Sequence, residues 1–276
     1  MLGKMLKRVR ETTPLVHNIT NYVTVNDCAN IILATGGAPL MADDAKEVEE
    51  IVTISSALYL NIGTLNTRTV ESMMIAGKKA NSLGKPVILD PVGVGASTLR
   101  NETAGKLLET IDFAVIKGNS SEIRALYNNT RTTGGVDVQE EDIITDDTLD
   151  STIAFSKKAA LKFNSVVAMT GAIDIITDGK KVALCRNGHP LMAKITGTGC
   201  MLGSMIATYC GGQPNKVFEA AVHAITHMGL AGEIAGEKVL KRGEGTGHFR
   251  LYLLDKVGLM TEDELREGER VEFIEE

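Results

Sequence analysis

The chain has 276 residues, with 29 basic and 35 acidic side chains and a formal net charge of −6. A hydrophobic fraction of 43% with 23% charged residues is typical of a folded globular protein and excludes extensive disorder. The acidic balance argues against nucleic acid or an anionic membrane as the main partner, and no apolar run of about 20 residues predicts a membrane span. The basic first 14 residues lack the apolar segment of a secretory signal, and we expect a short amphipathic helix there.

Short apolar segments alternate with helical patterns in the first two thirds of the chain. Four segments show little alternation between apolar and polar residues, which indicates strands buried on both faces of a sheet. They are residues 57–63, 86–90, 113–118 and 166–171. The helical patterns between them cover residues 66–83, 99–109, 120–127 and 151–163. This order predicts an α/β fold, a three-layer sandwich whose mostly parallel central sheet has helices on both faces.

The pattern changes after residue 171. Residues 173–177 and 181–185 flank Asp178-Gly179 and predict an antiparallel edge hairpin. Helices are expected at 200–210, 215–235 and 250–257. We expect the polar segment 128–150 to be a mobile insertion, and the acidic residues 262–276 to be an exposed tail or helix. No linker interrupts the pattern, so the sequence predicts a single domain over residues 1–276.

Small and polar residues gather where the predicted strands end. Ligands of open parallel sheets bind beyond the carboxyl ends of the strands, so we expect these segments to form one site. Asp90 ends a strand and Glu122 begins a helix. One or two carboxylates with substrate phosphates and waters are the usual protein site for Mg²⁺. Taken singly, Asp90 is equally a turn residue before Pro91, and Glu122 an acid at a helix start.

The segment 195–203, ITGTGCMLG, is a glycine-rich turn that leads into an apolar helix. Free N–H groups and the positive end of the helix dipole make such a turn an anion site, and the same field favours the thiolate of Cys200. A glycine-rich loop with a buried cysteine is the alternative. Neither the Walker A motif nor the dinucleotide fingerprint matches. Cys28, Cys185 and Cys210 are expected to be buried free thiols of a reducing compartment.

Three histidines are candidates for chemistry. We interpret His17 as structural, with both ring nitrogens bonded by the neighbouring Asn-rich turn. His223 and His227 have the i, i+4 spacing of a metal pair on a helix. No third ligand is evident in the sequence, so packing in the core or at an interface is the favoured interpretation.

These motifs together resemble the hydroxyethylthiazole kinases of thiamine biosynthesis, within the ribokinase-like superfamily. The HNITN sequence and the cysteine of TGTGC are specific to that branch. The matching segments are 14–21 (PLVHNITN), 36–41 (GGAPLM), 90–95 (DPVGVG), 117–122 (KGNSSE), 167–171 (VAMTG) and 196–200 (TGTGC).

The resemblance implies ATP-dependent phosphorylation of the hydroxyl of 4-methyl-5-(2-hydroxyethyl)thiazole, with ATP and Mg²⁺, by a homotrimer with active sites near subunit interfaces. The lack of a secretory signal and of paired cysteines leads us to expect a cytoplasmic protein. It implies that Cys200 is the catalytic residue and that Asp90 and Glu122 lie in the Mg²⁺ region. The implied substrate-binding residues are Asn21, Val23, Met41 and Gly197. The implied ATP-binding residues are Lys117, Thr170, Thr198 and Gly199.

Two positions depart from the wider pattern. Superfamily relatives carry Asp where this chain has Cys200, and the family often has Arg at the position of Lys117. Lysine keeps the charge but lacks the bidentate fork of arginine, so triphosphate binding is expected to be looser. The alternatives are a kinase for another small alcohol, such as hydroxymethylpyrimidine or a sugar, a repair dehydratase of hydrated nicotinamide cofactors, and a non-catalytic thiazole-binding protein.

Overall fold

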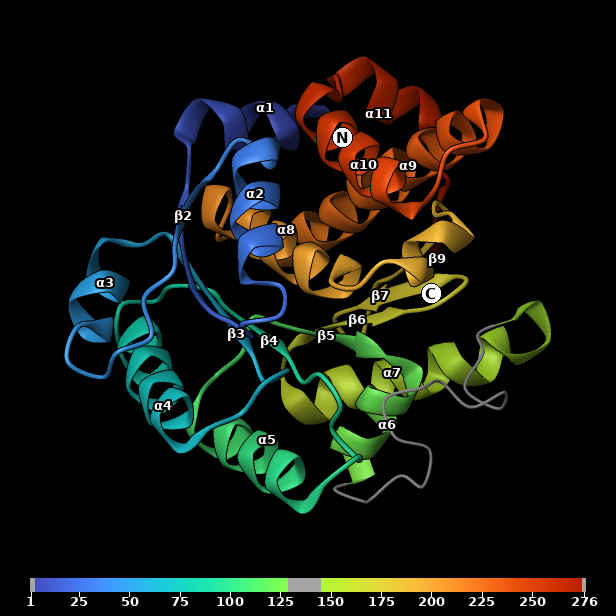
Figure 1. Ribbon diagram of the computed structural model, residues 1–276. Helices are drawn as coiled ribbons and strands as arrows, with labels where there is room; N and C mark the ends of the chain where they lie inside the picture. Colours follow the sequence, from blue (N-terminus) through green and yellow to red (C-terminus); the bar gives the residue numbers. More distant parts are fainter. Residues whose placement is uncertain (1–2, 129–144, 275–276) are drawn as a thin grey trace.

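A nine-stranded sheet lies between two layers of helices in the computed structural model, which describes residues 3–128 and 145–274 (Figure 1). The strand order is β2-β1-β3-β4-β5-β6-β7-β8-β9. Neighbouring strands from β2 to β6 pair in parallel, and β7, β8 and β9 continue the sheet in antiparallel pairs. The strands are β1 (Leu15–Ile19), β2 (Ala38–Leu40), β3 (Ala57–Asn61), β4 (Val87–Asp90), β5 (Val115–Asn119), β6 (Val166–Thr170), β7 (Asp174–Thr177), β8 (Val182–Cys185) and β9 (Val271–Ile274). The predicted fold class is confirmed.

Helices cover both faces of the sheet, and each face has its own hydrophobic core. One layer contains α1 (Gly3–Thr12), α2 (Val25–Thr35), α8 (Thr198–Gly212), α9 (Val217–Arg242), α10 (Thr246–Leu259) and α11 (Glu262–Gly268). The other layer contains α3 (Val48–Ile54), α4 (Thr67–Ser82), α5 (Thr98–Thr110), α6 (Ser120–Asn128) and α7 (Leu149–Phe163). Short 3₁₀ turns lie at Asp146–Thr148 and Pro190–Lys194. Within the described residues, no helix has both the length and the hydrophobicity needed to cross a membrane.

The four predicted parallel strands correspond to β3, β4, β5 and β6, and the predicted hairpin to β7 and β8. The hairpin does not form the edge of the sheet, because β9 pairs with β8 beyond it. Gly179 adopts φ +93 at the hairpin turn, the conformation for which glycine is favoured. The pattern missed β1, β2 and β9. The first of these has His17 and Asn18 in its centre, the second has only three residues, and the third contains an exposed glutamate. None of them therefore shows the continuous apolar run of a buried strand.

Several predicted boundaries are wrong. The helix expected at 215–235 continues to Arg242 and ends at the left-handed Gly243. The prediction stopped too early because most side chains in the last turns are exposed and show no clear apolar pattern. Helices α2 and α3 were not predicted. Of the insertion expected at 128–150, residues 129–144 lie outside the described residues, and the part from Asp146 onward is helical. The acidic end contains both a helix, α11, and the strand β9. The single domain over residues 1–276 stays a prediction.

The carboxyl ends of the parallel strands meet at one edge of the sheet. Asn61 at the end of β3 pairs with Asp90 at the end of β4, and Asn119 pairs with Thr170 on the next two strands. Helix α8 begins over the same edge and packs on β1, β3 and β4. The register thus brings together polar residues that are widely separated in the sequence.

Candidate active site

A cavity of about 380 Å³ opens at this edge of the sheet, beside the first turn of α8. Most of the predicted site residues line it. They are Asn21, Val23, Asp90, Lys117, Glu122, Thr170, Gly197, Gly199 and Cys200. Thr198 instead lines an adjoining cavity of about 600 Å³, which shares Thr170 and Gly199 with the first.

Met41 differs from the other predicted site residues, which all line one of these two cavities. It follows β2, is half-buried and packs against the core on the α8 side of the sheet. It is absent from the lining of either cavity as the described residues form them. Its predicted contact with substrate stays a prediction.

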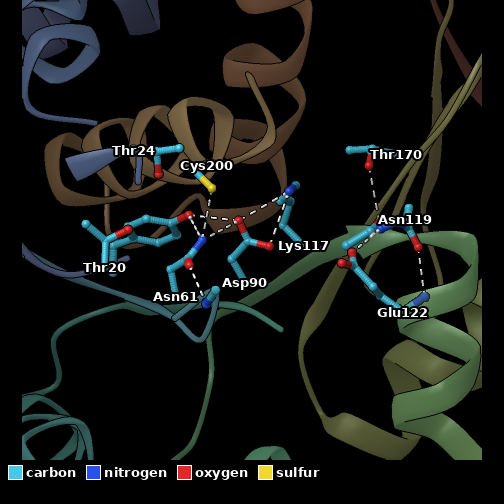
Figure 2. Close-up of polar contacts among 12 residues, drawn as sticks. Thr20, Thr24, Asn61, Asp90, Lys117, Asn119, Glu122, Thr170 and Cys200 are labelled. Carbon is cyan, nitrogen blue, oxygen red and sulfur yellow. Dashed lines mark hydrogen bonds and ion pairs between the residues drawn. The ribbon is translucent and has the colours of Figure 1, made fainter. Parts of the chain in front are cut away.

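Asp90 and Lys117 form a buried ion pair in the wall of the cavity (Figure 2). The ammonium nitrogen of Lys117 lies 3.3 Å from both carboxylate oxygens of Asp90. The same carboxylate accepts a hydrogen bond of 2.8 Å from the Tyr59 hydroxyl and one of 3.0 Å from Asn61 Nδ2. Burial by itself lowers the pKa of Lys117, but the Asp90 and Glu122 carboxylates outweigh it, and the pKa is raised. Lys117 is therefore a fixed positive charge in the site.

Glu122 is held at the start of α6 by a reciprocal pair of hydrogen bonds with Asn119. Its carboxylate accepts from the backbone N–H groups of Asn119 and Gly93, each at 2.9 Å. Asn119 Oδ1 accepts in turn from the N–H of Glu122 at 2.8 Å. Burial raises the pKa of Glu122, Lys117 opposes this, and Asp90 raises it further. Glu122 thus caps its helix and also adds negative charge to the cavity.

Cys200 lies in the first turn of α8, directly after the left-handed turn at Gly197 with φ +92. Its sulfur accepts hydrogen bonds from the side-chain amides of Asn21 and Asn61, each at 3.3 Å. Burial and the Asp90 carboxylate raise its pKa, and Lys117 only partly opposes them. The expected lowering of the Cys200 pKa by the helix terminus is therefore not seen, because desolvation and a nearby like charge outweigh it.

Asp90 and Glu122 are suitable for binding Mg²⁺. Two buried carboxylates face one buried ammonium on the same cavity, and their mutual repulsion contributes to the raised pKa of Glu122. A cation bound between them would relieve that repulsion. No cluster of three His, Cys, Asp or Glu side chains that could hold a metal occurs in residues 3–128 and 145–274. The ion would therefore need oxygens from substrate and water, as Mg²⁺ commonly does.

Sequence reasoning missed the residues that support this site. The sequence pattern places Asn61 at a strand end without indicating a role for it, and it marks Tyr59 as an ordinary core residue of β3. The ring of Tyr59 lies against Gly203, where a Cβ atom would come within 2.5 Å of Cε2. A tyrosine hydroxyl in a strand buried on both faces needs a polar partner, and this was the available signal.

His17, His227 and the three cysteines other than Cys200 have structural surroundings. His17 donates from Nε2 to the Ala42 carbonyl at 2.8 Å, but its buried Nδ1 has no hydrogen-bond partner. The prediction that both nitrogens are bonded is therefore wrong, since the nearby Asn18 side chain donates to the Val16 carbonyl instead. His227 bonds Tyr209 and the Val257 carbonyl. Cys28, Cys185 and Cys210 are buried and free, as expected.

Comparison with known proteins identifies the family to which this chain belongs. The sequence model of the hydroxyethylthiazole kinase family matches residues 6–263. The hydroxyethylthiazole kinase of Clostridium acetobutylicum is 52% identical over 272 residues, which cover 99% of both chains. The solved structure of the hydroxyethylthiazole kinase protein of Pyrococcus horikoshii OT3 superposes with a TM-score of 0.88 at 35% identity, with 99% of each chain covered.

A more distant structure has the same fold. A ribokinase-like superfamily protein of Enterococcus faecalis V583 has a TM-score of 0.60 at 11% identity, covering 90% of this chain and 87% of that one. At that identity the likeness concerns the fold alone. The match of the family model over most of the sequence, together with the close relatives, shows that this chain belongs to the hydroxyethylthiazole kinase family.

Proposed function

We propose that the protein transfers the γ-phosphoryl group of ATP to the hydroxyl of 4-methyl-5-(2-hydroxyethyl)thiazole, in the synthesis or salvage of thiamine. One observation carries the proposal. In a member of this kinase family, a single cavity combines a helix N-terminus, a buried ammonium, two carboxylates and a thiol. Phosphoryl transfer depends mainly on positioning and on neutralising charge, and this set of groups supplies both.

The residues have distinct tasks in this scheme. The free N–H groups at the start of α8, around Gly197 and Gly199, would bind phosphate oxygens, because the glycines permit a close approach of the backbone. Lys117 would add positive charge where the transferred group becomes more negative. Asp90 and Glu122 would hold Mg²⁺, which when bound screens the charge of the phosphates.

Cys200 would orient the substrate hydroxyl and accept its proton as the new phosphate ester forms. The raised pKa means that the resting group is a thiol, so the sulfur must first pass its proton to water in the open cavity before it acts as a base. Lys117 lowers that pKa and favours this step. Because positioning dominates phosphoryl transfer, Cys200 would add to the rate without being indispensable.

The two adjoining cavities suit two substrates of different size. The smaller one contains the acidic pair and Cys200, and it has room for a small ring with a hydroxyethyl arm. The larger one shares Thr170 and Gly199 with it and would hold the nucleoside of ATP, with Thr198 at the boundary. Apolar side chains such as Leu202, Ile225 and Met228 line the larger cavity and suit a flat base.

We also propose a homotrimer that works in the cytoplasm. Val23 lines the smaller cavity yet is 57% exposed, and its neighbour Tyr22 is 78% exposed. Large apolar side chains at the mouth of a site are typical of a surface that a second subunit covers. Met41 lies away from the cavity of its own chain and would then contact the substrate of a neighbour. The four free thiols suit a reducing compartment. Sedimentation equilibrium tests the trimer.

A coupled assay for ADP release tests the proposed reaction. The purified protein, ATP and Mg²⁺ are incubated with the thiazole alcohol, with hydroxymethylpyrimidine, with a sugar, or with no acceptor. The proposal expects ADP release with the thiazole alcohol and little with the others. Preference for another alcohol would identify a kinase of different specificity. Calorimetric binding of the thiazole alcohol without ADP release would instead identify a non-catalytic binding protein.

A further inference from the structure

We propose that Asn61 is a positioning residue that holds the sulfur of Cys200 in place beside Asp90, an inference that rests on the proposed function. Asn61 is almost completely buried and does not line the cavity. Any effect that it has on catalysis must therefore pass through the groups that it touches. Figure 2 shows its amide between the sulfur and the Asp90 carboxylate.

The orientation of the Asn61 amide follows from its hydrogen-bond donors. The Gly63 backbone N–H and Asn21 Nδ2 both donate to Asn61 Oδ1, each at 2.9 Å. A backbone N–H can only donate, so the oxygen must face Gly63 and the amide nitrogen must face the other way. That nitrogen then points at Cys200 Sγ at 3.3 Å and at Asp90 Oδ2 at 3.0 Å.

Asn21 is fixed by the same logic. Its Oδ1 accepts from the backbone N–H and the hydroxyl of Thr24, at 3.1 Å and 3.0 Å. Its Nδ2 is thereby turned toward Asn61 Oδ1 and Cys200 Sγ. The sulfur thus faces two amide donors whose orientations are set by backbone groups. A sulfur that accepts two N–H bonds has its remaining directions free for the cavity, where the substrate hydroxyl would lie.

Tyr59 keeps Asn61 in place from the other side. Its hydroxyl donates to Asp90 Oδ2 at 2.8 Å and lies 2.9 Å from Asn61 Nδ2. The amide has two N–H groups for three acceptors, so one N–H is shared between the adjacent Tyr59 and Asp90 oxygens and the other faces the sulfur. Gly203 leaves room for the tyrosine ring one turn after Cys200 on α8. Asn61 therefore links β3, β4 and α8 at the reacting end of the site. A rigid support of this kind determines how accurately a catalytic group is placed.

Two substitutions test the proposal. Asn61→Asp conserves volume but removes the amide donor, and Asn61→Ser removes it without adding charge. We expect each to lower kcat by about 10- to 100-fold, the effect of one hydrogen bond to a charged group. The KM for ATP should change less than twofold, because Asn61 does not line the cavity. A kcat within twofold of the wild type in a folded variant would overturn the proposal.

A double-mutant cycle shows whether the effect passes through the sulfur. In a Cys200→Ala background, Asn61→Ser should lower kcat less than about threefold. If it lowers kcat there as much as in the wild type, Asn61 acts through Asp90 or through the fold, and the proposal is wrong. Asn81→Asp makes the same chemical change in a partly exposed asparagine that bonds the Asp112 carbonyl, far from the site, and should leave kcat unchanged.

A measurement independent of kinase activity separates this inference from the proposed function. Iodoacetamide alkylation of Cys200 is followed by mass spectrometry of the intact protein at one pH, with Cys200→Ala as background. Asn61→Ser should slow alkylation about tenfold, since the sulfur loses one of its two N–H donors without gaining a nearby charge, whereas Asn81→Ser should not change it. An unchanged rate in Asn61→Ser overturns the inference. A slowed rate supports it even if the thiazole alcohol proves not to be the acceptor.

Discussion

The Lys117 ammonium lies 3.3 Å from the Asp90 carboxylate, and the two side chains are only 6% and 0% exposed. Such a pair adds little net stability, since desolvation of both charges offsets their attraction. Losing one partner is costly, because the other charge is left buried and uncompensated. Two hydrogen bonds, from Tyr59 and Asn61, hold Asp90 in this position. The main effect of the pair is thus to place two opposite charges beside Cys200, and its contribution to the stability of the fold is small.

Lys117→Met is therefore expected to lower the free energy of unfolding by about 3–5 kcal/mol. Adding Asp90→Asn should restore at least half of this loss, because the buried carboxylate paired directly with residue 117 then carries no charge. Urea denaturation followed by circular dichroism measures both variants. Lys181→Met is the matched control, since its pair with Glu219 is exposed, and it should change stability by less than about 1 kcal/mol. A Lys117→Met protein as stable as the wild type would contradict the buried charge pair.

Gly203 and Tyr59 give a second prediction. A Cβ atom at residue 203 would lie 2.5 Å from the tyrosine ring, which is fully buried and cannot move aside. Gly203→Ala should therefore destabilise the protein by about 1–3 kcal/mol, the usual cost of overpacking. Gly105→Ala, within α5, meets no atom within 4 Å and should be neutral or stabilising by up to about 1 kcal/mol. Thermal unfolding of the two variants compares them, and equal shifts would refute the close packing.

Cys200→Ala tests the role of the thiol in turnover. A general base contributes about 10²–10⁴-fold in favourable cases, but positioning dominates phosphoryl transfer. We therefore expect kcat to fall about 10- to 100-fold and to remain measurable. Cys210→Ala, at a buried thiol on the same helix, should keep kcat within about twofold. An unchanged kcat in Cys200→Ala would show that Cys200 is not the general base. A complete loss of activity would show that positioning of the substrates alone does not sustain phosphoryl transfer.

The buried His227 predicts a loss of stability in mild acid. Burial lowers its pKa to about 3, with a weaker opposing effect of its bond to the Val257 carbonyl. Between pH 6.5 and pH 3 the unfolded chain binds a proton that the folded protein excludes, so stability falls as the pH falls. From pH 7.5 to 5.5 the loss due to His227 is about 1.4 kcal/mol.

Urea denaturation at these two pH values measures the effect. His227→Gln should reduce the pH-dependent loss by about that amount, because glutamine does not titrate. The exposed His248→Gln should leave the loss unchanged. The same pH dependence in the wild type and in His227→Gln would show that residue 227 titrates normally in the folded protein.

Local patterns in the sequence predicted most of the parallel sheet. Strands β3 to β6 are buried on both faces, so they are continuous apolar runs between turn residues, and the hairpin at Gly179 has its own turn signal. Strand β1 has no such pattern, because His17 and Asn18 interrupt it and find their partners inside the protein. The pattern also could not show where α9 ends, since its last turns are exposed.

The family motifs, the fold class and the expectation that Asp90, Glu122 and Cys200 share one site can all be read from the amino-acid sequence. Short segments carry that information, because strand ends and glycine turns have local residue requirements. The hydrogen bonds of Asn61 with Cys200 and Tyr59, the absence of Met41 from the cavity lining and the raised pKa of Cys200 follow from the tertiary structure alone. Hydrogen-bond orientation, burial and the distance between charges depend on side chains brought together from β3, β4, β5 and α8, and no local pattern records those distances.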